Sequence, residues 1–226
     1  MTKIILVTGG NRGIGKEICR QLDRMDHKVI LCSRDLSKGK KAAKEMSPKV
    51  DVQELDVLDE KSIRKLEKHI ASTYGKLDVL INNAGIISED SSVVDSDPSD
   101  YRKVMETNFY GPWEMIKAFV PLLQKSKDGR IINVSSQMGE LSDLKRGGRA
   151  AYRMSKAALN ALTIQLSGEL PTIKVNAMHP GWVKTDMGGK DAQREVDKGA
   201  ESAVWLSVNE EIPNGCFIID KKVKKW

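Results

Sequence analysis

The chain has 226 residues, of which 40% are hydrophobic and 30% are charged. This length and composition fit one compact domain with its own core and exclude a disordered chain. The net charge is +6, but aromatic residues make up only 5% of the chain, so we expect a solvated basic surface, with a solvated Lys-rich end over 221–225, and no nucleic-acid partner.

Two further classes of protein are disfavoured by the sequence. No apolar run approaches the roughly 20 residues needed to span a bilayer, and the first residues lead straight into a strand-like run with no room for a signal peptide. We therefore expect a cytoplasmic protein with no membrane partner. The cysteines at 19, 32 and 216 form no CxxC pair, which argues against a disulfide framework and against a metal site.

Short apolar runs alternate with longer helical patterns along the whole chain. The strand candidates are 4–8, 28–32, 50–55, 79–81, 129–134, 173–178 and 216–219. The helix candidates are 13–25, 37–46, 59–74, 98–124, 151–170 and 197–208. Continuous apolar strands are typical of a sheet that is covered on both faces. The alternation predicts a single α/β domain over 1–226, with a Rossmann-type, doubly wound, seven-stranded and mostly parallel sheet and helices on both faces.

The first strand runs into a glycine-rich segment, TGGNRGIG at 8–15. Glycine lets the backbone approach a phosphate closely, and the helix that follows offers free N–H groups. The usual dinucleotide pattern GxGxxG fails because its last position is Ile18. The triphosphate pattern GxxxxGK[ST] fails because its last position is Glu17, whose carboxylate would repel a phosphate. The remaining TGxxxGxG pattern predicts a dinucleotide-binding loop.

Further motifs follow in order on the expected elements. They are NNAG at 82–85, TNFYG at 107–111, the serine pair at 135–136, YRMSK at 152–156 and PGWVKT at 180–185. Together they resemble the short-chain dehydrogenase/reductase superfamily from residue 3 nearly to the end of the chain. The segments PGWVKTDM at 180–187 and 217–226 resemble the carbonyl reductase branch.

The resemblance implies a catalytic tetrad of Asn108, Ser136, Tyr152 and Lys156. Tyr152 and Lys156 are four residues apart and share one helix face. A neighbouring ammonium is expected to lower the tyrosine pKa, so that Tyr152 exchanges a proton with a carbonyl or alcohol oxygen. Ser136, with Ser135 as the alternative, would donate a hydrogen bond to that oxygen. Asn108 would hold a water that relays protons to Lys156, which would also hold the nicotinamide ribose.

The resemblance also implies the cofactor contacts. The expected residues are Gly9, Asn11, Arg12, Gly13, Ile14, Gly15, Arg34, Asp56, Val57, Asn83, Ala84, Gly85, Tyr152, Lys156, Pro180, Gly181, Val183 and Thr185.

The end of the second strand indicates which nicotinamide is bound. The position that is usually acidic in NAD-binding proteins is Ser33, and Arg34 follows it. Arg12 and Arg34 would grip the 2′-phosphate of NADP with forked bonds. Asp35 is a competing signal: it is either a ribose-binding acid or the cap of the next helix. We expect NADP(H).

The substrate pocket is expected between loops near 86–97, 137–150 and 181–198. Its wall candidates are mostly apolar: Ile87, Gln137, Met138, Trp182 and Met187. We therefore expect an apolar carbonyl substrate. Some carbonyl reductases carry a long insertion before the active tyrosine. Only fifteen residues separate Ser136 from Tyr152 here, so the helices at 98–124 and 151–170 are free to pair in a homodimer or homotetramer.

Three functions fit these residues. The first is NADPH-dependent reduction of ketones, aldehydes or quinones, with Tyr152 as the general acid. The second is an alcohol dehydrogenase that works mainly in the oxidative direction. The third is a regulatory protein that senses NADP(H) without turnover, which the fold allows in principle. A serine hydrolase is excluded because Ser136 lacks the GxSxG elbow.

Overall fold

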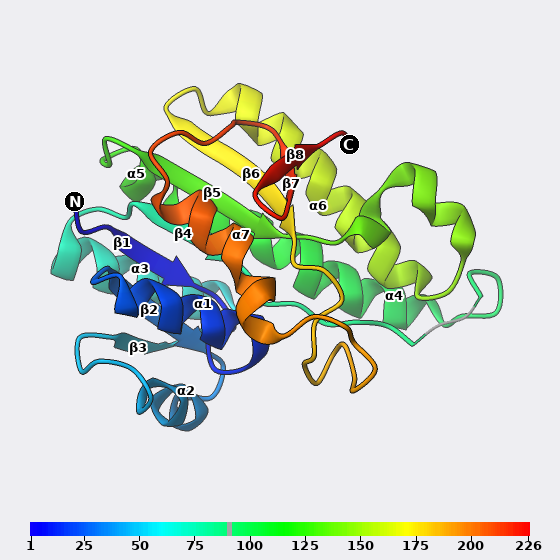
Figure 1. The fold of residues 1–226 in the computed structure, drawn as a ribbon, viewed down its shortest axis with the longest axis horizontal. Helices are drawn as coiled ribbons and strands as arrows, with labels where there is room; N and C mark the ends of the chain where they lie inside the picture. The colour runs from blue at the N-terminus through cyan, green and yellow to red at the C-terminus, as the bar shows by residue number, and fades with distance from the viewer. Residues whose placement is uncertain (90–91) are drawn as a thin grey trace.

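The computed structural model describes residues 1–89 and 92–226, and it is a three-layer α/β structure (Figure 1). The central sheet has the strand order β3-β2-β1-β4-β5-β6-β7-β8. All neighbouring strands are parallel except the last pair. The strands are β1 (Ile4–Val7), β2 (Lys28–Ser33), β3 (Asp51–Glu54), β4 (Val79–Asn82), β5 (Gly129–Val134), β6 (Ile173–His179), β7 (Phe217–Ile219) and β8 (Lys222–Lys224).

Helices cover both faces of the sheet, as the sequence predicts. The helices are α1 (Gly13–Arg24), α2 (Leu36–Ala43), α3 (Glu60–Tyr74), α4 (Pro98–Met105), α5 (Gly111–Leu123), α6 (Ala150–Glu169) and α7 (Val196–Val208). Alternate residues of the strands face opposite sides. Leu6 and Ile30 pack in one core with α3, α5 and α6, while Val7 and Leu31 pack in the other with α1, α2 and α7.

The number of strands corrects the prediction of seven. Lys222–Lys224 pairs with β7 in the antiparallel direction as β8, where the sequence analysis expects a solvated tail. The lysine side chains can stay in water because an edge strand needs only its backbone for pairing. Trp226 anchors the end by stacking on Phe217, with ring centroids 5.5 Å apart.

The predicted continuous helix over 98–124 is also corrected. A π-helical turn, Glu106–Tyr110, separates α4 from α5. Pro112 has no N–H to donate to the carbonyl of Asn108, four residues earlier, so one α-helical hydrogen bond cannot form there. Such π turns often occur at functional sites, and this one carries Asn108.

The strand order reverses between β1 and β4, because the chain runs outward from β1 through β2 to β3 and then returns to β4. In open α/β sheets, ligands bind at such a switch point, beyond the carboxyl ends of the strands. The segments that follow β1, β2, β4, β5 and β6 all lie at this edge. They carry the residues that the sequence motifs single out.

Candidate active site

The glycine loop after β1 has the geometry of a phosphate-binding turn. Gly9 and Gly13 have φ values of +65° and +51°, a region that side chains disfavour. A Cβ on Gly15 would lie 2.4 Å from the carbonyl oxygen of Gly9, so only glycine fits there. No side chain caps the start of α1. The free N–H groups of its first turn therefore remain available to an anionic ligand.

The turn after β4 is held against this loop by Thr8. The backbone N–H groups of Asn83 and Ala84 each donate to the Thr8 hydroxyl oxygen at a distance of 3.0 Å. The Asn83 amide donates to the carbonyl of Thr8 at 2.8 Å. These bonds fix the spacing between the two strand ends, and the NNAG motif therefore forms one side of the cleft.

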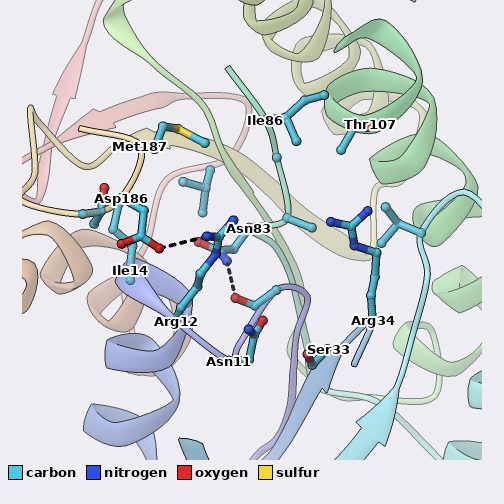
Figure 2. A pocket seen from close by; sticks show the side chains of 18 of the residues that line it. Asn11, Arg12, Ile14, Ser33, Arg34, Asn83, Ile86, Thr107, Asp186 and Met187 are labelled. Carbon is cyan, nitrogen blue, oxygen red and sulfur yellow. Dashed lines mark hydrogen bonds and ion pairs between the residues drawn. The ribbon is translucent and has the colours of Figure 1, made fainter. Parts of the chain in front are cut away.

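A cavity of about 400 Å³ lies between these turns, and Figure 2 shows the side chains around it. Most of the predicted cofactor residues line it: Gly9, Asn11, Arg12, Gly13, Ile14, Gly15, Arg34, Asp56, Val57, Asn83, Ala84, Gly85, Tyr152, Lys156, Pro180 and Thr185. The glycine cradle and the uncapped start of α1 fit a dinucleotide. The structure thus brings these residues together around one cavity, and their contacts with the cofactor stay predictions.

Four of the predicted catalytic and cofactor-binding residues do not line this cavity. Val183 is 3% exposed and packs against Gly199, while Gly181 turns the chain with a φ of +84°. Asn108 is fully buried, and Ser136 lies beside the cavity next to the lining residue Ser135. Their contacts with a cofactor or a substrate therefore stay predictions.

The pocket end beside β2 carries basic side chains together with the acidic residues Asp35 and Asp56. Asp35 caps α2, because its carboxylate accepts from the N–H groups of Ser37 at 2.9 Å and Lys38 at 3.1 Å. This geometry favours the cap interpretation of Asp35 over the ribose-binding one. Arg34 and Lys38 both line the cavity.

Lys38 is a residue that the sequence analysis missed. The four-residue spacing from Arg34 is not a helical signal, because Arg34 precedes the extended N-cap residue Asp35 and lies outside α2. The fold brings Lys38 to the cavity, and no local pattern in the sequence marks it.

Arg12 lies on the opposite side of the cavity from Arg34, as Figure 2 shows. Its guanidinium pairs with the carboxylate of Asp186 at 2.8 Å, and both side chains are largely exposed. The forked grip of Arg12 and Arg34 on one phosphate is therefore not formed in this structure. A long exposed side chain exchanges such a partner at little cost.

Asn108 ties the π turn to the segment after β4. Its side-chain oxygen Oδ1 accepts from the N–H of Ile86 at 2.8 Å. Its side-chain nitrogen Nδ2 donates to the carbonyl of Ile86 at 2.8 Å and to the Ser155 hydroxyl at 3.0 Å. Ser155 in turn donates to the carbonyl of Tyr152 at 2.7 Å. The Asn108 side chain thus couples the turn after β4 to the helix that carries Tyr152 and Lys156.

Lys156 and Tyr152 are both buried at the inner end of the cleft. The Lys156 ammonium donates to the carbonyl of Val134 at 2.8 Å and lies 5.6 Å from the centre of the Tyr152 ring. Burial lowers the pKa of Lys156 to about 8. Burial also raises the pKa of Tyr152, against a hydrogen bond with Ser136 and the charge of Arg149.

The direction of the Tyr152 shift differs from the expected lowering of its pKa. The reason is that removal of the phenolate from water outweighs the favourable contacts around the ring. In this structure Tyr152 therefore holds its proton at neutral pH.

Ser136 stands beside Tyr152 at the start of a short 3₁₀ turn, Gln137–Gly139. Its hydroxyl oxygen accepts from the N–H of Met138 at 3.1 Å. The hydroxyl of Ser135 has a different partner, because it donates to the side chain of Asn160 at 2.6 Å. The structure thus favours Ser136 over Ser135 as the serine that faces Tyr152.

Of the predicted wall residues, Met187 lines the cavity, and Ile86 lines it where Ile87 was expected. The indole of Trp182 is half exposed and donates to the carbonyl of Gly188 at 2.8 Å. The predicted loop 86–97 includes residues 90 and 91, which lie outside the described residues. Among residues 1–89 and 92–226 there is no cluster of metal-binding side chains and no helix long and apolar enough to cross a membrane.

The glycine cradle, the switch-point cleft and the Tyr152–Lys156 pair define a nucleotide-dependent oxidoreductase of the Rossmann type. The short chain dehydrogenase family model matches residues 3–196, and the chain belongs to this family. It resembles the carbonyl reductase branch, as the sequence motifs indicate.

Individual relatives cover nearly the whole chain. (+)-Neomenthol dehydrogenase of Arabidopsis thaliana is 34% identical and covers 98% of this chain and 97% of its own length. Carbonyl reductase [NADPH] 1 of Homo sapiens is 32% identical over 278 aligned positions and covers 99% of this chain and 98% of its own. Because this chain has only 226 residues, the human enzyme contains segments that it lacks.

Solved structures agree with this relationship. The NADPH-bound carbonyl reductase from chicken fatty liver has a TM-score of 0.89 and 32% identity, with 100% of this chain and 99% of that chain covered. Carbonyl reductase Sniffer of Drosophila melanogaster has a TM-score of 0.89 and 30% identity, with 99% and 98% covered.

Proposed function

We propose that this chain is an NADPH-dependent reductase of ketone, aldehyde or quinone carbonyls, in which Tyr152 is the general acid. The observation that carries the proposal is the buried group of Tyr152, Ser136 and Lys156 at the inner end of the nucleotide cleft. The nicotinamide would supply the hydride when bound. The residues of the chain would hold the carbonyl and provide its proton.

The pKa directions support reduction over oxidation. Because burial raises the pKa of Tyr152, its phenol is protonated at neutral pH and is ready to donate to the carbonyl oxygen. Ser136 would donate a second hydrogen bond to the same oxygen and stabilise its developing negative charge. Lys156, whose pKa of about 8 leaves it mostly charged at pH 7, would hold the ribose and stabilise the phenolate after proton transfer.

The choice of NADPH rests on the basic end of the cleft. Arg34 and Lys38 line the cavity, and the carboxylate of Asp35 is occupied as a helix cap. An arginine there would bind a 2′-phosphate through charge-assisted bonds. The NADPH named in two of the relatives supports the same assignment.

The substrate is proposed to be an apolar carbonyl compound. Met187 and Ile86 line the cavity, and Trp182 and Leu141 are exposed on the flanking loops. We also propose that residues 1–226 form a single domain with the pocket between the three loops.

The oligomeric state is proposed to be a homodimer or homotetramer. Tyr110 at the end of the π turn, Trp113 on α5, and Met154 and Ile164 on α6 are large side chains that remain exposed. Pairing of these helices between copies would bury them. Light scattering of the purified chain tests this, and a monomer at all concentrations would refute it.

The central test measures NADPH oxidation with a panel of ketones, aldehydes and quinones, with NADH in parallel. We expect turnover with NADPH and a loss of about 10² to 10⁴ in rate for Tyr152→Phe. A Tyr152→Phe enzyme as fast as wild type would refute the mechanism. Faster NADP⁺-dependent alcohol oxidation than reduction would favour the dehydrogenase that the name of the Arabidopsis relative suggests. Tight NADPH binding without any turnover would favour a sensor.

A further inference from the structure

The segment that leads into α6 has an unusual backbone. Gly147, Gly148 and Arg149 have consecutive φ values of +69°, +64° and +53°. The third of these is not glycine, so its left-handed conformation is strained. A strained backbone persists only where the surrounding structure holds it in place.

Hydrophobic burial is limited in this segment, where Leu144 is only partly buried. No residue of the 3₁₀ turn Leu141–Arg146 is buried, and the Leu141 side chain is 78% exposed. The position of the segment must therefore depend on polar contacts. One such contact lies at its beginning, where the Lys224 ammonium of β8 pairs with Glu140 at 2.6 Å.

A buried guanidinium provides the contacts at the other end. The Nε of Arg153 donates to the carbonyls of Gly147 at 3.1 Å and Gly148 at 2.9 Å. Its Nη1 donates to the carbonyl of Asp143 at 3.2 Å and to the carboxylate of Asp143 at 3.0 Å. The Arg153 side chain is only 9% exposed. A planar fork of donors is suited to holding several oxygens at once.

The place of Arg153 connects this contact to the candidate active site. It directly follows Tyr152 in the first turn of α6, and Figure 1 shows the segment in green beside that helix. At the other end, Gly139 packs so closely on α6 that a Cβ there would lie 2.6 Å from the carbonyl carbon of Lys156. The chain between Ser136 and Tyr152 is thus fastened to α6 at both ends.

We propose that Arg153 is a positioning residue that clamps the 143–148 segment onto α6 and so orders the substrate side of the site. The inference rests on the proposed function. Arg153 itself touches no reacting atom. It acts by fixing the 143–148 segment, which would form part of the wall of the substrate pocket. It also fixes the backbone that leads into Tyr152.

Two variants separate this role from a general charge effect. Arg153→Met keeps the apolar stem and removes every donor. Arg146→Met is the matched control, because Arg146 also pairs with Asp143, at 2.6 Å, but is 75% exposed. We expect Arg153→Met to raise the KM for the carbonyl substrate about tenfold while the Kd of NADPH stays within about twofold of wild type. Arg146→Met should leave both constants within about twofold, and Arg153→Lys should recover part of the loss.

Hydrogen exchange provides a readout that needs no substrate. In Arg153→Met we expect faster amide exchange over 141–149 than in wild type, with unchanged exchange in the strands. Unchanged exchange in this segment, or an unchanged KM and kcat, overturns the clamp. Equal losses in NADPH binding and in strand protection also overturn it, because they indicate a general loss of structure. If Arg153→Met does not fold, the same measurements are made on Asp143→Asn, which keeps Arg153 and removes the charge of its carboxylate partner.

The two proposals fail in different ways. A wild-type chain that reduces no carbonyl refutes the proposed function, while the exchange comparison still tests the clamp. A wild-type chain with activity and an Arg153→Met variant with the same KM refutes the clamp alone.

Discussion

The N–H of Tyr152 donates to the hydroxyl of Ser88 at 3.2 Å, which joins the segment after β4 to the first turn of α6. The residue before α6, Arg149, supplies no side-chain cap. Ser88, which is 8% exposed, therefore serves as a cap from a distant part of the chain. The same bond fixes the backbone of the proposed general acid.

Removal of this cap should weaken both stability and catalysis. Loss of a helix cap costs about 1 kcal/mol, so Ser88→Ala should lower the free energy of unfolding by about that amount. We expect kcat to fall about tenfold because the Tyr152 backbone is no longer fixed. Urea unfolding and steady-state kinetics measure the two effects.

Two control variants accompany Ser88→Ala: one removes a different serine hydroxyl, and the other keeps a hydroxyl at position 88. Ser72→Ala removes an exposed hydroxyl that bonds within α3, and it should change neither quantity. Ser88→Thr keeps a hydroxyl and should retain most of the activity. A Ser88→Ala enzyme with wild-type kcat would show that the bond does not position Tyr152.

The pKa of Lys156 predicts a pH limit. Burial lowers this pKa to about 8, so the ammonium is present below that pH and is lost as the pH rises through it. Because kcat/KM for NADPH reports the free enzyme, we expect this ratio to be level below about pH 7 and to fall above about pH 8. The profile is measured at a saturating carbonyl concentration.

Lys156→Arg distinguishes this group from the others in the site. An arginine stays charged across the whole range, so the variant, although slower, should not show the fall near pH 8. Tyr152 does not produce the fall, since burial raises its pKa and keeps it protonated. Superimposable profiles of wild type and Lys156→Arg would contradict the assignment.

Much of the fold and site follows from local signals in the sequence. The glycine spacing after β1 and the apolar runs of the buried strands depend on backbone rules that hold in any context. Tyr152 and Lys156 are on one helix, so their spacing alone brings them together. The structure places these features on the elements that the sequence predicts.

The remaining features depend on contacts between distant segments. The β8 strand forms because β7 offers an edge, which the lysine-rich sequence 221–225 does not reveal. The cap on α6 comes from Ser88, and the raised pKa of Tyr152 comes from burial by several elements. Lys38 and Arg153 required the positions of the loops they face. Pro112 is a local signal of the break between α4 and α5.

The preference for NADPH over NADH should depend on Arg34. Arg34→Ala should raise the Kd of NADPH about tenfold to a hundredfold and leave that of NADH nearly unchanged, because a charge-assisted bond to the 2′-phosphate is lost. Lys38→Ala should have a smaller effect in the same direction. Fluorescence titration with both nucleotides measures it. Equal changes for NADPH and NADH would show that these residues do not contact the phosphate.

Arg12 gives a separate prediction, because its partner Asp186 is on the opposite side from Arg34. An exposed pair of this kind contributes less than about 1 kcal/mol. Asp186→Asn should therefore change the Kd of NADPH by less than about fivefold. Arg12→Gln should weaken NADPH more than Asp186→Asn does, if Arg12 leaves Asp186 for the phosphate. A larger loss in Asp186→Asn would indicate that the pair itself closes the cleft.

An ionic cluster lies near the amino ends of β1 and β5, away from the site at their carboxyl ends. This cluster predicts that the stability of the fold is sensitive to acid. Arg130, which is 1% exposed, donates to Asp128 at 2.9 Å and to the carbonyl of Leu206 at 2.7 Å. Lys3 pairs with the same carboxylate at 2.8 Å. Burial alone would raise the pKa of Asp128, but its bonds to Arg130 and Lys3 lower it from 3.8 to about 2.

The sign of this shift sets the expected pH range. A carboxyl with a lower pKa in the folded state stabilises the fold above its unfolded pKa and loses that effect as the pH falls toward 2. Asp128→Asn should lower the free energy of unfolding at pH 7 by about 2 kcal/mol, the typical effect of a bond to a charged group. The difference from wild type should shrink between pH 4 and pH 2, where Asp128 becomes protonated in the wild type. Asp191→Asn, at an exposed turn, should match wild type throughout. A constant difference between Asp128→Asn and wild type down to pH 2 would show that the carboxylate charge does not contribute, and that packing around Arg130 carries the stability instead.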